Sequence, residues 1–349
     1  MKFYIHEQLA SESFEYKTQS LLGYILPRID HKEYDAVCVN DYSDIVAETN
    51  SWLIVPCTQT SDKYWPTGFM DFIIKNNQLN IILDFSGEPY CDLECQPDPN
   101  SDILVSKCLG LLENRSGRVV LFHGSLNKEF FCENTFGIPA HLIHYSIFSK
   151  EYYRHFYGID NQIITKVFNH ATHDFLCLNG RQCDIRTSLI NRFLDSSQSM
   201  IYSLDRSELS NWDPYLRWYL NRSLPVEKIC DSKIYVVTET FPNHNLFITE
   251  KTAKAFAMGK PFVVMGSTDF HKQLEDWGFH IFTDSHREDT DDVVNWTFNQ
   301  AMQIKDNYSA SRYLDPCMHN LSLFHSVSFQ KKLLQEYFLA PLHNISVDK

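Results

Sequence analysis

The sequence predicts an α/β protein built from two Rossmann-like, doubly wound domains. Short apolar runs of strand length alternate with helix-compatible stretches, and this alternation is present in both halves of the chain. Many runs are continuously apolar, which is typical of parallel strands buried on both faces. A length of 349 residues also fits two domains of about 150–180 residues each.

The first half carries the expected N-terminal domain, over residues 1–160. Its strands are predicted from short apolar runs at residues 2–7, 36–41, 52–57, 79–85, 118–124 and 142–148. Helix-compatible stretches at 68–77 and 101–113 lie between them. The polar and aromatic segment 151–174 is expected to connect the two domains.

The second half carries the expected C-terminal domain, over residues 161–349. Its strands are predicted at 175–181, 199–204, 233–240 and 262–266, with a short one ending at 282. Its helices are predicted at 185–195, at 250–258 and from 271, and the chain ends in an amphipathic helix at 327–342. The acidic run 288–292 is interpreted as a loop followed by a helix start.

The net charge and the low glycine content disfavour two classes of function. The formal charge is −13, which disfavours duplex nucleic acid as the main partner, because such proteins usually present a basic face. Glycine is scarce, with 12 residues, and neither G-x-G-x-x-G nor G-x-x-x-x-G-K-[ST] occurs. A glycine-rich phosphate loop is therefore not expected.

Cysteine spacing and hydropathy bear on the compartment. The ten cysteines lack zinc-site spacing, so reduced thiols and no bound metal are expected. The N-terminal residues MKFYIHEQLA do not resemble a signal peptide, and no apolar run reaches the roughly 20 residues that span a bilayer. These features predict a cytoplasmic protein without a membrane span, in the host cytoplasm if the chain is viral.

The most informative segment covers residues 233–282. A predicted strand ends at 238–240, a polar loop that includes Asn245 follows, and Thr249 is a good N-cap for a helix that begins at Glu250. Ligands of open α/β sheets bind beyond the carboxyl ends of strands and near helix N-termini. Thr240, Asn245 and Thr249 are therefore candidates for contact with a nucleotide.

Two charged residues on the first helical turn match the two polar parts of a nucleotide. Lys251 would add positive charge to a diphosphate, and the carboxylate of Glu250 would accept hydrogen bonds from a ribose diol. Glu and Lys in a first turn are often only solvated, and Glu there favours the helix dipole by itself. The complete strand–loop–helix–strand frame is what favours the ligand site.

The run FITEKTAKAFAMGKPFVVMG, at 247–266, resembles the C-terminal donor-binding part of the α-1,3-fucosyltransferase family. It is also similar to phage-type and bacterial glycosyltransferases with an I-T-E-K-T-x-K run. The upstream segment FLCLNGRQCDIRTSLINRFLD is similar to the strand–turn–helix in which these families place an arginine, here Arg186 or, second, Arg181. The resemblance covers residues 174–285, about a third of the chain. The loop VVTETFPNHN departs from the family pattern, which leaves the sugar and the base open.

The resemblance implies a GT-B architecture, with two Rossmann-like domains facing each other across a cleft. It implies a metal-independent glycosyltransferase without a cofactor, whose donor substrate is a nucleotide-diphosphate sugar. Glu250 would contact the ribose, and Lys251 and Arg186 would neutralise the leaving diphosphate. A hydroxyl of a glycan or small molecule would be the acceptor, bound by the N-terminal domain.

An inverting reaction needs a base that deprotonates the acceptor hydroxyl. Asp84, Glu88 and His123 follow or end predicted strands of the N-terminal domain and are the candidates. An Asp after a strand also commonly caps the following turn. Two other functions stay open: a phage-type enzyme that glycosylates hydroxymethylated DNA bases, and a non-catalytic protein that binds sugar nucleotides.

Overall fold

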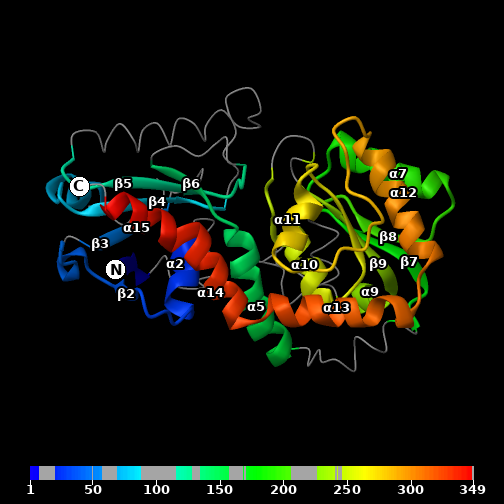
Figure 1. Cartoon of the computed structure of the whole chain (residues 1–349), viewed down its shortest axis with the longest axis horizontal. Helices are drawn as coiled ribbons and strands as arrows, with labels where there is room; N and C mark the ends of the chain where they lie inside the picture. Colours follow the sequence, from blue (N-terminus) through cyan, green and yellow to red (C-terminus); the bar gives the residue numbers. More distant parts are fainter. Residues whose placement is uncertain are drawn as a thin grey trace. The chain divides into compact units, whose positions relative to one another are not determined.

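The computed structural model describes residues 1–7, 20–48, 50–56, 69–87, 115–127, 134–156, 168, 170–205, 226–239, 242 and 246–347. The chain divides into two compact units, one made of Met1–His144 with Gln330–Lys349 and the other of Tyr145–Phe329. Each unit is an α/β structure with one parallel sheet (Figure 1). The sequence analysis expected two domains that are each one continuous segment and meet at residue 160. In the structure the first unit consists of two segments, because the end of the chain returns to it.

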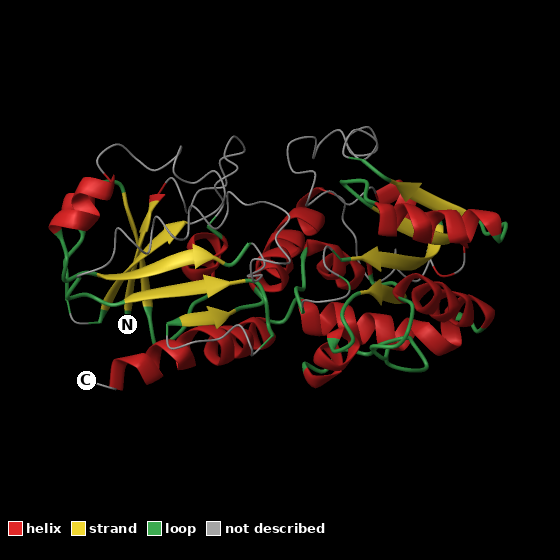
Figure 2. Ribbon diagram, turned by 90° about the horizontal axis from the view of Figure 1, so that it is seen from above, coloured by secondary structure: helices red, strands yellow, loops and turns green. Residues whose placement is uncertain are grey.

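The sheet of the first unit has the strand order β2-β1-β3-β4-β5-β6. Every neighbouring pair is parallel, and Figure 2 shows the sheet with helices beside it. The strands are β1 Lys2–His6, β2 Asp35–Val39, β3 Ser51–Pro56, β4 Asn80–Phe85, β5 Val119–His123 and β6 Thr135–Gly137. All residues of β3 and β4 are buried, which explains why apolar residues dominate their sequences, SWLIVP and NIILDF.

Helices from both ends of the chain belong to the first unit. The early ones are α2 Leu21–Ile25, η1 Leu26–Arg28, η2 Tyr42–Asp44 and α3 Phe69–Lys75. The late ones are the π-helical turn η6 Gln335–Leu339, α15 Ala340–Val347 and most of α14 Val327–Leu334, whose first three residues belong to the second unit. Phe338 of η6 packs on Phe3 and Phe122, with ring centroids 5.2 and 4.9 Å apart. The terminal helix predicted from the sequence thus covers the sheet of the first unit.

The strand expected at 142–148 is wrong, because these residues lie inside helix α5 Ala140–Phe156. Residues 142–149 are all buried, so the helix carries no exposed polar face along this stretch. A short, continuously apolar run has the same appearance in a buried helix and in a buried strand. Periodicity therefore gave no means of separating the two.

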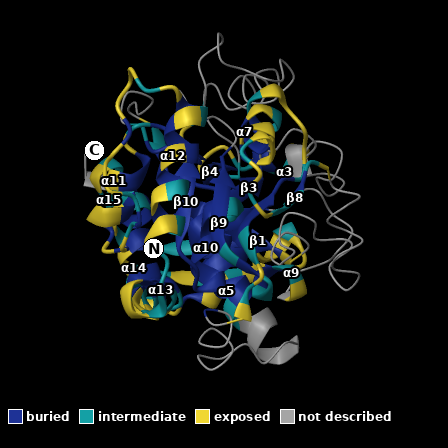
Figure 3. Cartoon of the chain, turned by 90° about the vertical axis from the view of Figure 1, so that its right-hand side faces the viewer, coloured by how far each residue is buried: buried dark blue, intermediate teal, exposed yellow. Residues whose placement is uncertain are grey.

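The sheet of the second unit has the order β10-β9-β7-β8, and its strands are also parallel. They are β7 His173–Leu178, β8 Met200–Ser203, β9 Ser232–Thr238 and β10 Phe262–Met265. Strands β9 and β10 are among the most deeply buried parts of the unit (Figure 3). Each predicted strand is present except the one ending at 282, because residues 279–283 form no regular element.

The helices of the second unit are α7 Asp184–Asp195, α9 Val226–Cys230, α10 Glu250–Met258, α11 Phe270–Asp276, α12 Val293–Asp306 and α13 Ala310–Phe324. Strand β7 lies between β8, which follows it in the chain, and β9, so the strand order reverses at β7. Such a reversal opens a crevice at the carboxyl ends of the two central strands. Helix α7 follows β7 and helix α10 follows β9, so both helices begin at this edge of the sheet.

Candidate functional site

Hydrogen bonds tie together the carboxyl ends of three strands at the reversal point. The hydroxyl of Thr238, at the end of β9, donates to the side-chain oxygen of Asn179, which follows β7. The backbone N–H of Asn179 donates to Oγ of Ser203 at 3.0 Å, and that hydroxyl bonds to the carbonyl of Asn179 at 3.0 Å. All three residues are buried, so the floor of the crevice is rigid.

Arg186 stands over this floor, on the first turn of α7. Its side chain is only 5% exposed, and it donates to the carbonyl oxygens of Arg181 at 2.9 Å and Thr238 at 3.4 Å. Among the described residues, no carboxylate pairs with the guanidinium, and its Nε has no hydrogen-bond partner. A buried charge without a counter-ion is costly, so this position suits an anionic ligand.

Arg181, the second arginine expected here, has a different role in the structure. It is exposed, and its backbone carbonyl accepts the bond from Arg186. The side chain that lies inside the crevice is therefore that of Arg186, which the sequence resemblance ranked first.

Helix α10 begins as the sequence predicts. Thr249 is its N-cap and accepts from the N–H of Lys251 at 3.2 Å, and the helix ends at Gly259 in the left-handed region, with φ 58°. Ala253, Phe256 and Ala257 are buried on one side of the helix. The sequence signals at both ends of the helix were therefore sufficient to place it.

The N-terminus of α10 is closed by a carboxylate that the sequence analysis did not select. Glu239, directly after β9 and 2% exposed, accepts from the N–H of Thr249 at 3.1 Å and from its hydroxyl at 2.6 Å. The hydroxyl of Thr252 donates to the same carboxylate at 2.7 Å. We expected the N–H groups of this turn to face an anionic ligand, whereas those of Thr249 and Lys251 already have protein acceptors.

Lys251 lies among these groups with its side chain 15% exposed. Its ammonium is 3.1 Å from Oγ1 of Thr249, 3.4 Å from a carboxylate oxygen of Glu250 and 3.9 Å from one of Glu239. The side chain of Glu250 is 14% exposed. Lys251 and Glu250 thus form a pair at the mouth of the crevice, and a phosphate would have to replace Glu250 as the partner of the lysine.

Asp84, a candidate base, is buried at the end of β4 and holds helix α2 in place. Its carboxylate accepts from the hydroxyl of Ser20 at 2.5 Å, from the N–H of Leu22 at 3.0 Å and from both the N–H and the hydroxyl of Ser86. Burial raises the pKa of Asp84, and these hydrogen bonds oppose the rise. The bonds show Asp84 capping a turn and a helix, the alternative role of an Asp after a strand.

His123, a second candidate base, ends β5 and is fully buried. In this conformation its ring has no surface that an acceptor hydroxyl could reach. Glu88, Thr240 and Asn245 lie outside the described residues, so their roles stay predictions.

Two further features of the described residues bear on the site. No cluster of three or more His, Cys, Asp or Glu side chains among them is arranged to hold a metal ion. None of the helices in the described part of the chain has the length and apolar character needed to cross a membrane.

Comparison with known proteins adds no assignment. No protein-family model matches this chain, and no curated protein sequence is significantly similar to it.

Proposed function

We propose that this chain is a metal-independent glycosyltransferase of GT-B type, which transfers a sugar from a nucleotide-diphosphate donor to a hydroxyl acceptor. The observation that carries the proposal is the buried Arg186 guanidinium at the strand-order reversal, which forms no ion pair with any described carboxylate. Dinucleotide and nucleotide ligands of doubly wound folds bind at this topological position.

Arg186 would donate to oxygens of the diphosphate. As the bond between the sugar and the diphosphate breaks, negative charge grows on the leaving group, and fixed positive charge stabilises it. Lys251 would exchange Glu250 for a phosphate oxygen, which frees the carboxylate of Glu250 to accept from the ribose diol. Glu239 would keep the first turn of α10 fixed during this exchange.

The acceptor chemistry belongs to the first unit in this proposal. In an inverting reaction a base takes the proton of the acceptor hydroxyl, the acceptor oxygen bonds to the anomeric carbon, and the nucleoside diphosphate leaves. Since Asp84 and His123 are both buried, Glu88 is the candidate that remains to be placed.

A non-catalytic sugar-nucleotide-binding protein is the second candidate. The observation that favours it is that both described candidate bases are buried, and that Asp84 is bonded on both oxygens. Nucleotide binding without hydrolysis of the donor or transfer of its sugar would distinguish this function from catalysis.

Thermal unfolding with UDP-, GDP-, dTDP- and ADP-sugars tests the proposal. A ligand at 100 times its Kd stabilises the folded state by about 2.7 kcal/mol, a shift of several degrees for a chain of this size. We expect one nucleotide class to produce the shift and Arg186→Gln to remove it. Arg181→Gln, which changes the exposed arginine just before α7, should retain the shift. Absence of any shift in the unmodified protein would refute the proposal.

A further inference from the structure

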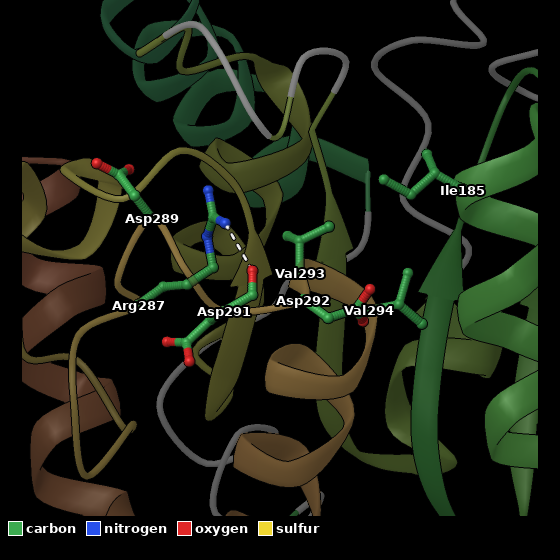
Figure 4. Close-up of a pocket in the computed structure, with 7 residues that line it drawn as sticks. All are labelled: Ile185, Arg287, Asp289, Asp291, Asp292, Val293 and Val294. Atoms are coloured by element: carbon green, nitrogen blue, oxygen red, sulfur yellow. Dashed lines mark hydrogen bonds between the residues drawn. The ribbon is translucent and has the colours of Figure 1, made fainter.

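A pocket of about 600 Å³ opens within the second unit, between the start of α7 and the start of α12 (Figure 4). Its apolar wall consists of Ile185, Val293 and Val294. Ile185 directly precedes Arg186, the residue of the proposed diphosphate site, on the first turn of α7. A volume of this size is typical of sites that bind small molecules.

Arg287 lines the same pocket and is 6% exposed (Figure 4). It donates to the carbonyl oxygens of Pro242 at 3.0 Å and Asp291 at 3.4 Å. Within the described part of the chain, its Nε has no hydrogen-bond partner and no carboxylate forms an ion pair with it. A buried donor left without an acceptor costs about 1–3 kcal/mol.

Three aspartates complete the lining, but they are not equally available to a ligand. Asp292 caps α12 by accepting from the N–H of Asn295 at 2.7 Å. One oxygen of Asp291 accepts from the N–H of Glu288 at 2.9 Å. Asp289 is exposed and makes no bond to another described residue. Both oxygens of Asp289 and one oxygen of Asp291 therefore accept no hydrogen bond from a described residue.

The charged and apolar residues that line the pocket indicate which class of ligand it can bind. Three aspartates outnumber one arginine, so a second anion would be repelled. An uncharged group with many hydroxyls suits the lining, because carboxylates accept from hydroxyls, Arg287 donates to a sugar oxygen and the apolar wall covers C–H groups. A nucleotide sugar has two such groups, the ribose and the transferred sugar. Because Glu250 is proposed to bind the ribose diol, the transferred sugar is the group left for this pocket.

We propose that this pocket binds the transferred sugar of the donor, with Asp289 and Asp291 accepting hydrogen bonds from its hydroxyls and Arg287 donating to one of its oxygens. The inference rests on the proposed glycosyltransferase function. It adds residues that determine which sugar is used, on a loop that the sequence resemblance does not single out.

Isothermal titration calorimetry of the full chain separates the contribution of the nucleoside diphosphate to binding from that of the sugar. Kd is determined for UDP, GDP, dTDP and ADP, and for UDP-glucose, GDP-mannose, dTDP-glucose and ADP-glucose. The quantity compared among variants is the ratio of Kd for the sugar nucleotide to Kd for its parent diphosphate. Asp289→Asn keeps the size of the side chain, and Glu288→Gln makes the same charge change on the same loop without lining the pocket.

We expect Asp289→Asn and Arg287→Lys to raise this ratio about tenfold or more, because each weakens a charged hydrogen bond to the sugar. Glu288→Gln should leave the ratio unchanged. If Asp289→Asn weakens the diphosphate and the sugar nucleotide equally, the pocket holds the ribose, and the inference is overturned while the proposed function stands. An unchanged ratio in both pocket variants overturns it as well. If the unmodified chain binds none of the eight compounds, the proposed function fails, and this inference fails with it.

Discussion

Replacing Glu239 by Ala tests whether this buried carboxylate organises the start of α10. The change removes the acceptor for the N–H and the hydroxyl of Thr249 and for the hydroxyl of Thr252. Because the surrounding residues are buried, these donors would not recover full hydration. They would instead remain unsatisfied next to the cation of Lys251, 3.9 Å from the lost carboxylate.

The expected magnitude follows from these contacts. A hydrogen bond to a charged group contributes about 1.5–3 kcal/mol, but bonds that share one acceptor are not additive. Removal of one partner from a buried charged set costs about 3–5 kcal/mol, which is the loss we expect for Glu239→Ala. Glu239→Gln should cost less, about 1–2 kcal/mol, because one amide oxygen can still accept from the N–H of Thr249 and the hydroxyl of Thr252.

Urea unfolding followed by far-UV circular dichroism measures the loss as a fall in the midpoint at constant m. Glu275→Ala is the control, since Glu275 forms an exposed pair with His286 at 3.1 Å and should change stability by less than about 1 kcal/mol. If Glu239→Ala unfolds at the same urea concentration as this control, the carboxylate does not organise the helix start and the reasoning is refuted.

Two further predictions concern buried cationic groups. Arg186→Met should leave the stability of the ligand-free protein unchanged or raise it, because it removes a buried charge that has no described ion-pair partner. The same variant should lose the nucleotide-induced thermal shift. A stability loss above about 2 kcal/mol would contradict this prediction. Burial, with His286 and Arg287 nearby, lowers the pKa of His271 to about 3, so only the unfolded chain gains this proton between pH 6.5 and pH 3. Stability should therefore fall by about 2 kcal/mol from this group between pH 8 and pH 5, and His271→Leu should remove that part of the pH dependence in urea titrations.

The sequence predicted most strands because burial on both faces leaves a simple signal. Strand β10 is continuously apolar and every residue of it is buried, and β9 contains the buried apolar run 234–237. Helix α10 was predicted at both ends, because Thr249 caps it through its own side chain and Gly259 ends it through its own backbone. Signals of this kind are local, so they can be recognised in one sequence without knowledge of the tertiary structure.

The features that the sequence did not predict depend on contacts between distant segments. Glu239 lies ten residues before Thr249, and nothing in the sequence indicates that its carboxylate turns back to the helix start. Arg287 lies within a charged run that is typical of a solvated loop, yet it is buried against Pro242. The terminal helix has an amphipathic pattern that predicts a buried face but not the unit against which it packs.

The two cationic residues of the proposed donor site, Arg186 and Lys251, have different partners in the ligand-free structure. Arg186 is held by the carbonyl oxygens of Arg181 and Thr238, so a ligand anion would meet it without the loss of an ion pair. Lys251 is held by Glu250, so the same anion would have to displace a carboxylate first. Because Glu239 already offsets the positive end of the α10 dipole, the helix itself has little attraction left for the anion. In the proposed function, initial capture of the diphosphate would therefore depend on Arg186, and the exchange at Lys251 would couple that capture to the release of Glu250 toward the ribose.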